Sequence, residues 1–208
     1  MIGIDEYLCC LGLAELKFLR LRGNNLGESS GGRVDIFVGC NASLQTLDLS
    51  HNKLVALPGG TLAAMSISLT SLQLNDNRFH TDLLDDSDLD SLPSPIPSHY
   101  NLSNLRMLNL ARTQLRVFEG RWLSTLTQLT HLDLTCNNFK NVTKMFFQGL
   151  PSSLTILNMA FCSSNLADAP KVEPDAFTTL GVNAVNQSSL KSLILSGGFF
   201  KGHKFYFK

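Results

Sequence analysis

One apolar spacing recurs along the chain and constrains the fold more than any other feature. Each copy has leucine or methionine at its first, fourth and sixth positions, most often asparagine at its ninth and an apolar residue close behind. The first copy starts at Leu16, and six more start at residues 44, 69, 105, 129, 154 and 190. Start-to-start distances of 28, 25, 36, 24, 25 and 36 residues indicate a period of 24 to 25 residues with two longer insertions.

The repeated leucines predict a stack of short parallel strands, because a single repeat cannot bury its own apolar residues but neighbouring repeats can. The first, fourth and sixth residues point inward, and adjacent strands lie about 4.8 Å apart. We therefore predict one solenoid segment over residues 1–208, with a curved parallel sheet on its concave face, an irregular convex side, insertions at about 80–101 and 167–189, and no caps. The predicted strands lie near residues 16–21, 44–49, 69–74, 105–110, 129–134, 154–159 and 190–195.

The asparagine at the ninth position has a structural interpretation. Its side-chain amide can pair with backbone groups of the turn that would otherwise be buried without a partner. Thr113 and Cys162 can replace it only in part, and Gly198 cannot. A second apolar signature on the convex side places Cys40 in the core, where Met65 and Leu150 stand in other repeats. The predicted asparagine ladder consists of Asn24, Asn52, Asn77 and Asn137.

Two stretches, SLQTLDLSHNKLVALPGGTL and LTQLTHLDLTCNNF, resemble Toll-like receptor ectodomains and the longer, extracellular type of leucine-rich repeat. The resemblance covers about residues 13–200. It implies an ectodomain segment on the extracellular side of the cell surface that binds a protein, glycan or microbial ligand and acts as a receptor homodimer or heterodimer. The cysteine-rich caps, membrane helix and signalling domain of such receptors are missing here, which suggests a fragment or a truncated gene model.

Two other classes remain open at this point. A secreted or cell-surface adhesion or matrix protein would share the same repeats without a signalling domain. A cytosolic sensor module is less favoured, because its repeats usually run longer and carry a regular convex helix. An enzyme is the remotest option: common catalytic motifs are absent, and Asp48, Ser50 and His51 on one short strand cannot form a triad.

Composition narrows the choice of partners. The formal net charge is zero, which removes the electrostatic reason to propose nucleic acid or an anionic membrane surface. No stretch reaches the ~20 apolar residues of a membrane-spanning helix, and Asp5 and Glu6 stand where a signal peptide would carry positive charge. Neither a signal peptide nor a transmembrane helix is predicted, and no cofactor.

The residues between the inward leucines form the candidate binding surface. The third residue of each run contributes a mixed column that includes Phe18, Met107, His131 and Ile156. Exposed apolar groups on a sheet face favour contact with a ligand, although a solvated face would be polar in any case. The fifth residue contributes a mainly polar column of Arg20, Asp48, Gln73, Asn109, Asp133, Asn158 and Ile194.

The first insertion concentrates acidic residues. Asp86, Asp88 and Asp90 have the spacing that begins a calcium loop, but Ser91 and Pro97 stand where the loop needs glycine and a bidentate glutamate. We therefore predict a solvated acidic loop and no metal. Sequons for N-glycosylation lie off the predicted strands, at Asn41, Asn101, Asn141 and Asn186.

The five cysteines do not define a disulfide framework. Cys136 is expected near the surface and Cys162 at an inward asparagine position, so their side chains should point apart and not pair. No partner is predicted for the adjacent Cys9 and Cys10. The aromatic and basic residues 199–208 are interpreted as part of a further repeat. Without caps the exposed ends of the stack should cause aggregation or dimerisation.

Overall fold

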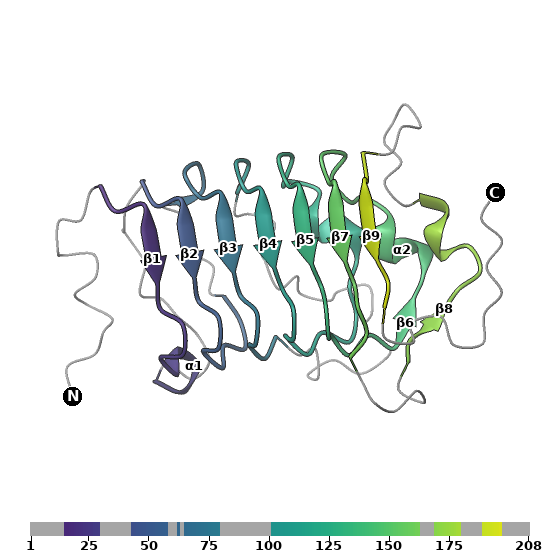
Figure 1. Ribbon diagram of the computed structural model, residues 1–208, viewed down its shortest axis with the longest axis horizontal. Helices are drawn as coiled ribbons and strands as arrows, with labels where there is room; N and C mark the ends of the chain where they lie inside the picture. The colour runs from purple at the N-terminus through teal and green to yellow at the C-terminus, as the bar shows by residue number, and fades with distance from the viewer. Residues whose placement is uncertain are drawn as a thin grey trace.

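The computed structural model describes residues 15–29, 43–57, 62, 65–79, 101–162, 169–179 and 189–196. Its main sheet has seven parallel strands that lie side by side in chain order (Figure 1). This arrangement confirms the predicted parallel-sheet solenoid. The strands are β1 (Phe18–Arg20), β2 (Thr46–Asp48), β3 (Ser71–Gln73), β4 (Met107–Asn109), β5 (His131–Asp133), β7 (Ile156–Asn158) and β9 (Ser192–Ile194).

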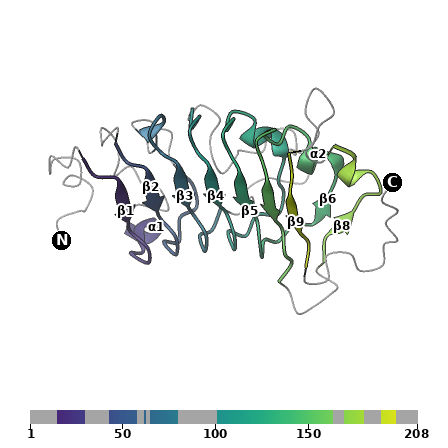
Figure 2. The same ribbon diagram turned by 45° about the horizontal axis from the view of Figure 1, so that its top comes forward.

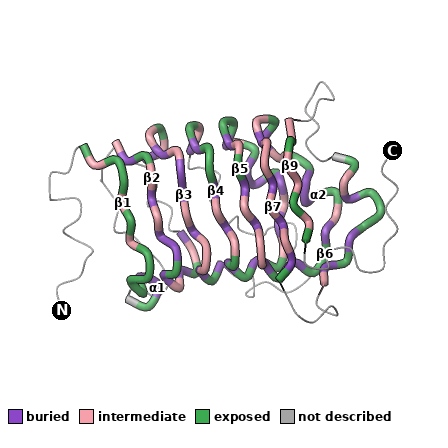
Figure 3. The backbone as a smooth tube through the Cα atoms, in the orientation of Figure 1, coloured by how far each residue is buried: buried purple, intermediate pink, exposed green. Residues whose placement is uncertain are grey.

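The leucines of the repeat form one continuous core behind the sheet. In the second turn Leu44, Leu47 and Leu49 are 3%, 0% and 0% exposed. The corresponding residues of the first and last strands, such as Leu19 and Leu193, are only half-buried. The middle residue of each inner strand, a leucine, is buried, and most of its neighbours on the strand are half-buried or exposed (Figure 3), as expected where one face packs on a core.

The convex side is built from short helical turns and a cluster of aromatic rings. The helical elements are α1 (Leu26–Ser29), η4 (Gly120–Leu123), α2 (Lys144–Phe147) and η6 (Ala176–Thr179). Phe146 of α2 packs against Phe118 and Phe139 at ring-centroid distances of 4.8 and 4.9 Å, and Phe147 lies 4.9 Å from Phe177. Turns of the solenoid therefore share a continuous aromatic layer. The helix α2, which carries Phe146 and Phe147, lies toward the C-terminal end of the stack in the turned view of Figure 2.

The convex side is more regular than predicted at its C-terminal end. Strands β6 (Asn141–Val142) and β8 (Lys171–Val172) pair in parallel as a second, two-stranded sheet. Val142 and Val172 are 0% and 3% exposed. A buried apolar residue at the same place in two turns supports this pairing, and part of the predicted insertion 167–189 supplies one of the strands.

Asn77 shows how the asparagine position holds neighbouring turns together. Its Oδ1 accepts hydrogen bonds from the backbone N–H groups of Asn52 (3.1 Å) and Leu54 (2.9 Å) in the preceding turn. Its Nδ2 donates to the carbonyl oxygens of Leu49 (3.0 Å) and Leu74 (2.7 Å). The side chain thus pairs four backbone groups while it is itself only 1% exposed.

The other residues of this ladder make different sets of hydrogen bonds, depending on the residue type and on the turn in which they lie. Asn52 and Asn137 repeat the bonds of Asn77 to their own and the preceding turn. The Thr113 hydroxyl lies 2.7 Å from the Leu110 carbonyl of its own turn and 3.1 Å from Asn137 Oδ1 of the next turn. Within the described residues it makes no bond to the preceding turn, since one hydroxyl cannot replace a whole amide. Asn24, in the first described turn, is exposed and its amide donates only to its own turn.

A second ladder runs along the opposite edge of the sheet. The residue before the first leucine is a serine in several turns, and its hydroxyl donates to a carbonyl of the preceding turn. Ser43 bonds to Leu16 O at 3.0 Å, Ser68 to Leu44 O at 2.8 Å and Ser153 to Leu129 O at 2.7 Å. The sequence signal for this ladder is the serine that recurs directly before the leucine run.

Several predictions concern positions outside the described residues. They are those for Cys9, Cys10, Cys40, Asn41, Asn186, the acidic run 82–90, Gly198 and residues 199–208. The division of the chain into one segment with two insertions likewise stays a prediction.

Candidate functional site

The seven strands bring the two predicted columns into register on the open face of the main sheet, here called the sheet face. Consecutive strands pair Phe18 with Thr46 and Arg20 with Asp48, and the same register continues to β9. The polar column is Arg20, Asp48, Gln73, Asn109, Asp133, Asn158 and Ile194. The mixed column is Phe18, Thr46, Ser71, Met107, His131, Ile156 and Ser192.

The acidic and amide residues of the polar column also shape the turn that follows each strand. Oδ1 of Asp48 accepts from the Ser50 N–H at 3.0 Å, and Oδ1 of Asp133 accepts from the Thr135 N–H at 2.9 Å. Asn109 and Asn158 make the equivalent bond at 3.0 and 3.3 Å. A short side chain that bonds to the backbone two residues on stabilises a turn. The periodic sequence pattern alone does not predict this second role.

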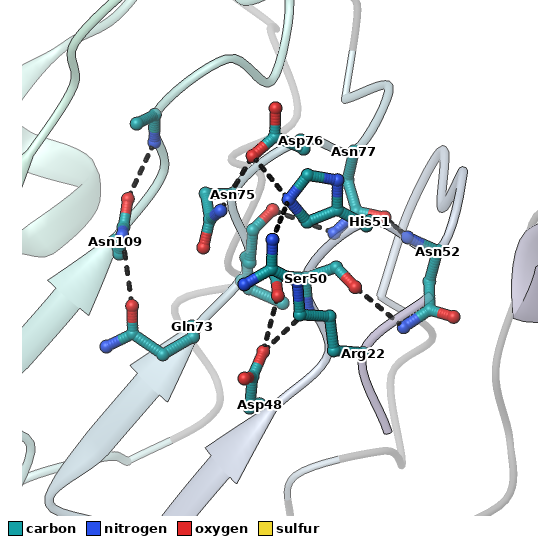
Figure 4. A network of polar contacts seen from close by, with 12 residues as sticks. Arg22, Asp48, Ser50, His51, Asn52, Gln73, Asn75, Asp76, Asn77 and Asn109 are labelled. Atoms are coloured by element: carbon teal, nitrogen blue, oxygen red, sulfur yellow. Dashed lines mark hydrogen bonds and ion pairs between the residues drawn. The ribbon is translucent and has the colours of Figure 1, made fainter. Parts of the chain in front are cut away.

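Part of the hydrogen-bonding capacity of the column remains available to a ligand. Within the described residues, the second carboxylate oxygen of Asp48 and that of Asp133 accept no hydrogen bond, and both side chains are partly exposed. Gln73 and Asn109 are linked directly, since the Asn109 amide donates to Gln73 Oε1 at 3.0 Å (Figure 4). The column therefore presents one carboxylate on each side of a pair of amides that are hydrogen-bonded to each other.

Apolar groups of the mixed column frame these polar groups. Phe18 is 62% exposed and Met107 is 43% exposed. Ile156 is less exposed than these two and is half-buried. His131 is exposed, and its Nδ1 lies 2.8 Å from Thr130 Oγ1. In the polar column Ile194 is 43% exposed. The sheet face thus combines carboxylates and amides in its middle with apolar contacts beside them.

A charged cluster lies on the edge where the strands end. Nε2 of His51 is 3.0 Å from both Arg22 and Oδ2 of Asp76, and the Asn75 amide donates to the same carboxylate at 2.7 Å (Figure 4). One ring nitrogen cannot accept from Arg22 and donate to Asp76 at once, so only one of the two contacts is a hydrogen bond in a given protonation state.

On the same edge an exposed ion pair joins neighbouring turns. Lys53 Nζ lies 2.5 Å from Oε1 of Glu28. The hydrogen bond and the positive charge of Lys53 lower the pKa of the Glu28 carboxyl below its ordinary value of 4.5. Because the pair is solvent-exposed, it contributes little to the stability of the fold.

The structure pairs Cys136 with Cys162, contrary to the prediction that their side chains point apart. Their Cα atoms are 4.8 Å apart and a disulfide joins them. The residue before the asparagine position has a positive φ in the preceding turns, for example 57° at Cys136 and 55° at Arg112. Phe161 holds this place in the next turn without a positive φ and packs into the core at 9% exposure. With Phe161 buried and its φ outside the left-handed region, this turn follows a different path from the preceding ones and leaves Cys162 exposed beside Cys136.

Two of the predicted sequons lie in the described residues. Asn101 and Asn141 are both exposed, and Asn141 lies on β6, away from the sheet face. Among the described residues there is no group of three or more His, Cys, Asp or Glu side chains that could hold a metal ion. None of the helices in the described ranges has the length and apolar character that crossing a bilayer requires.

Comparison with known proteins agrees with this architecture. Two family models described as leucine-rich repeats match residues 83–139 and 40–61. Toll-like receptor 3 of Boselaphus tragocamelus is 30% identical over 160 residues, which cover 67% of this chain and 18% of that receptor. Leucine-rich repeats and immunoglobulin-like domains protein 3 of Homo sapiens is 33% identical over 139 residues, covering 66% of this chain and 10% of that protein. Keratocan of Danio rerio is 32% identical over 110 residues, covering 53% and 28% respectively.

The chain therefore spans less than a third of each of these relatives. Sequence identity to this chain is nearly the same for a Toll-like receptor and for the two relatives of other kinds. The comparisons therefore identify the type of repeat and do not select one specific function. The repeated strands, the asparagine ladder and the matched repeats lead to one assignment. The chain is a leucine-rich-repeat protein with distant similarity to Toll-like receptor ectodomains and to other proteins built from this repeat.

Proposed function

We propose that the chain is a non-catalytic recognition segment of an extracellular receptor of the Toll-like kind, and that the sheet face contacts the ligand. The observation that carries this proposal is the register of the sheet, which aligns partly exposed side chains from seven consecutive strands. A row of short strands supplies a rigid platform, and rigid platforms lose little entropy on binding. Leucine-rich repeats are typically binding modules.

The disulfide supports an extracellular location. Disulfides persist in oxidising compartments and are rare in the cytosol, and Cys136 and Cys162 form one between adjacent turns of the main sheet. This pairing disfavours the cytosolic sensor module. The second candidate is a secreted or cell-surface adhesion or matrix protein, because similarity extends equally to leucine-rich-repeat proteins that are not named as Toll-like receptors.

The carboxylates of the sheet face offer a test that preserves the fold. Asp48→Asn with Asp133→Asn removes two negative charges but keeps the Oδ1 atoms that bond to the turns, as Asn109 and Asn158 already do. The matched control is Glu173→Gln with Asp175→Asn, which removes two charges from exposed residues on the convex side. We expect the first pair to weaken binding by about fivefold or more and the control pair to leave it unchanged.

The protein is secreted from animal cells and measured by surface plasmon resonance against immobilised lipopolysaccharide, a synthetic lipopeptide, β-glucan and collagen. A second variant, Met107→Asn with Asn109→Thr, introduces a sequon in the middle of the sheet face and blocks it with a glycan. Binding that survives both sheet-face variants would contradict the proposed surface. Binding to collagen alone would favour the adhesion or matrix candidate over the receptor.

A further inference from the structure

The sheet face carries two short rows of side chains on three adjacent strands. These strands are β4, β5 and β7, which lie side by side in the main sheet (Figure 1). The two rows together are called the β5 patch. Side chains two residues apart on a strand point to the same face, about 6.5 Å apart, so one long side chain of a partner can contact both rows. The register sets Met107, His131 and Ile156 in one row and Asn109, Asp133 and Asn158 in the other.

Asp133 gives the β5 patch a negative charge that its neighbours in the sheet do not offset. The other carboxylate of the polar column, that of Asp48, is aligned with Arg20 on the next strand. Both residues aligned with Asp133 are neutral amides. One oxygen of Asp133 accepts from the Thr135 N–H at 2.9 Å, and within the described part of the chain the second accepts no hydrogen bond. A cation from a partner would complete this half-buried carboxylate.

Hydrogen bonds beside His131 determine the tautomer of its neutral ring. Thr130 Oγ1 donates its one proton to the Arg106 carbonyl at 3.0 Å. The contact of 2.8 Å between the same oxygen and Nδ1 of His131 therefore needs a proton on Nδ1. Nε2 then carries a lone pair, and it has no hydrogen-bond partner among the residues that the structure describes. His131 thus presents an exposed acceptor in the row next to the free oxygen of Asp133.

Apolar groups flank these two acceptors. Met107 is 43% exposed on one side of His131, and Ile156 is half-buried on the other. A long cationic side chain can bury its alkyl stem on such groups while its head makes hydrogen bonds. Arg106 precedes β4 and lies three residues before Asn109, about 10 Å along the strand. That distance exceeds the screening length of about 8 Å at physiological ionic strength, so the charge of Arg106 opposes a bound cation only weakly.

We propose that the β5 patch binds an arginine side chain of a protein partner, with the guanidinium on Asp133 and His131 and the stem on Met107. The inference rests on the proposed function, since it assigns a partner chemistry to the same sheet face. A guanidinium carries five donors in a planar fork and no acceptor, so it can serve two separate acceptors at once. A neutral saccharide fits less well, because its hydroxyl groups would leave the Asp133 charge uncompensated.

The test follows the Cε1–H signal of His131 by NMR in the secreted protein, labelled with carbon-13 histidine. His131→Gln identifies this signal among those of the five histidines. The probe is N-acetyl-arginine amide, and the matched neutral probe is N-acetyl-citrulline amide, which replaces one guanidinium nitrogen by oxygen. Titrations are made at about pH 8, where an ordinary imidazole is neutral, and at about 0.15 M ionic strength. We expect the arginine probe to bind about fivefold or more tightly than the citrulline probe.

Three charge variants locate the binding site. Asp133→Asn keeps the oxygen that bonds to the turn and should weaken the arginine probe by about fivefold or more. Asp48→Asn is the same change at the same repeat position, but beside Arg20, and should weaken the probe by a smaller factor of about twofold. The matched control Asp175→Asn removes an exposed charge on the convex side and should change the affinity by less than that. Equal factors for Asp133→Asn and either other variant would overturn the proposal.

Further probes separate arginine from other partners, and thermal melting checks that each variant folds. N-acetyl-lysine amide should bind about twofold or more weakly than the arginine probe, because an ammonium group has no planar fork. Equal binding of the lysine or citrulline probe would overturn the choice of arginine. Maltotetraose that shifts the His131 signal at lower concentration than the arginine probe would overturn it in favour of a saccharide.

The two proposals fail on different results. The proposed function fails if immobilised ligands bind the sheet-face variants as tightly as the wild type in surface plasmon resonance. The arginine proposal fails if the NMR titrations show no preference for arginine over citrulline, even where those ligands still need the sheet face. A preference that is present in the wild type and absent in Asp133→Asn supports the β5 patch.

Discussion

Replacement of Asn77 by alanine should test the ladder that holds the recognition surface in register. The change removes four hydrogen bonds and leaves the N–H groups of Asn52 and Leu54 and the Leu74 carbonyl without these partners. The Leu49 carbonyl keeps the Asn52 amide at 3.0 Å. Each buried group left unpaired costs about 1 to 3 kcal/mol. Three such groups give a loss of about 3 kcal/mol or more, a large part of a total stability of about 5 to 15 kcal/mol.

The chain supplies its own intermediate case. Thr113 keeps the bond to its own turn, to Leu110 O at 2.7 Å, and lacks those to the preceding turn. Asn77→Thr should therefore keep the Leu74 carbonyl paired and cost about 2 kcal/mol or more, for the two backbone N–H groups that lose their partner. The matched control is Asn75→Ala, two residues away. The Asn75 side chain is only partly buried and donates to Asp76 alone, so its loss should cost less than about 0.5 kcal/mol.

Urea denaturation gives the measurement. Trp122, the single tryptophan of the chain, is 8% exposed and reports on the core by fluorescence. Circular dichroism is recorded on the same samples, because a stack of repeats can unfold in parts. If Asn77→Ala lowers the free energy of unfolding no more than Asn75→Ala does, water replaces the amide at no cost and the ladder does not stabilise the fold.

Three further predictions concern the cross-link, close packing and glycosylation. Cys136→Ser with Cys162→Ser should lower the free energy of unfolding by about 3 to 4 kcal/mol, as expected for a closed loop of 26 residues; a urea midpoint that does not change on reduction or mutation would contradict the cross-link. Gly120→Ala should destabilise the fold by about 1 to 3 kcal/mol, because the added Cβ would lie 2.7 Å from Gln148 O. Gly23 has a φ of 73° and no atom within 4 Å of an added Cβ, so Gly23→Ala should cost only about 1 kcal/mol of backbone strain. Equal shifts in melting temperature for the two variants would refute the packing argument. Asn101→Gln and Asn141→Gln should each remove one glycan from the secreted protein, seen as a step in gel mobility that peptide-N-glycosidase abolishes in the wild type; a wild type without any such shift would weaken the extracellular assignment.

The sheet could be predicted from the sequence because its signal is periodic and redundant. Leucines at three fixed positions of a run determine which side of each strand faces the core, and the repeat aligns the strands with one another. The register that pairs Asp48 with Gln73 and Asp133 with Asn158 follows from this alignment. A period read over seven copies tolerates the loss of any one position, as with Thr113.

The disulfide could not be predicted by the same reasoning, because it depends on a departure from the repeat. The periodic pattern places Cys162 inward, but in that turn Phe161 is buried and lacks the positive φ of the equivalent residues in the preceding turns. A pocket beside the disulfide, which is lined in part by Arg116, Lys140 and Lys171, is equally non-periodic, since Lys171 comes from the second insertion. Sites that arise where repeats diverge need coordinates, because their residues share no common position in the pattern.

The double role of the polar column limits how such a surface can vary. A residue at the fifth position that bonds to the backbone two residues on must be short and carry an acceptor, as Asp48, Asn109, Asp133 and Asn158 do. Replacement by a long or apolar residue would leave the turn without this bond. The third position carries fewer such duties and ranges from Phe18 to Ser71, Met107 and His131. Residues of the mixed column should therefore mainly determine which ligand the sheet face prefers. The carboxylates of the polar column should add a negative charge that acts on every ligand in the same way.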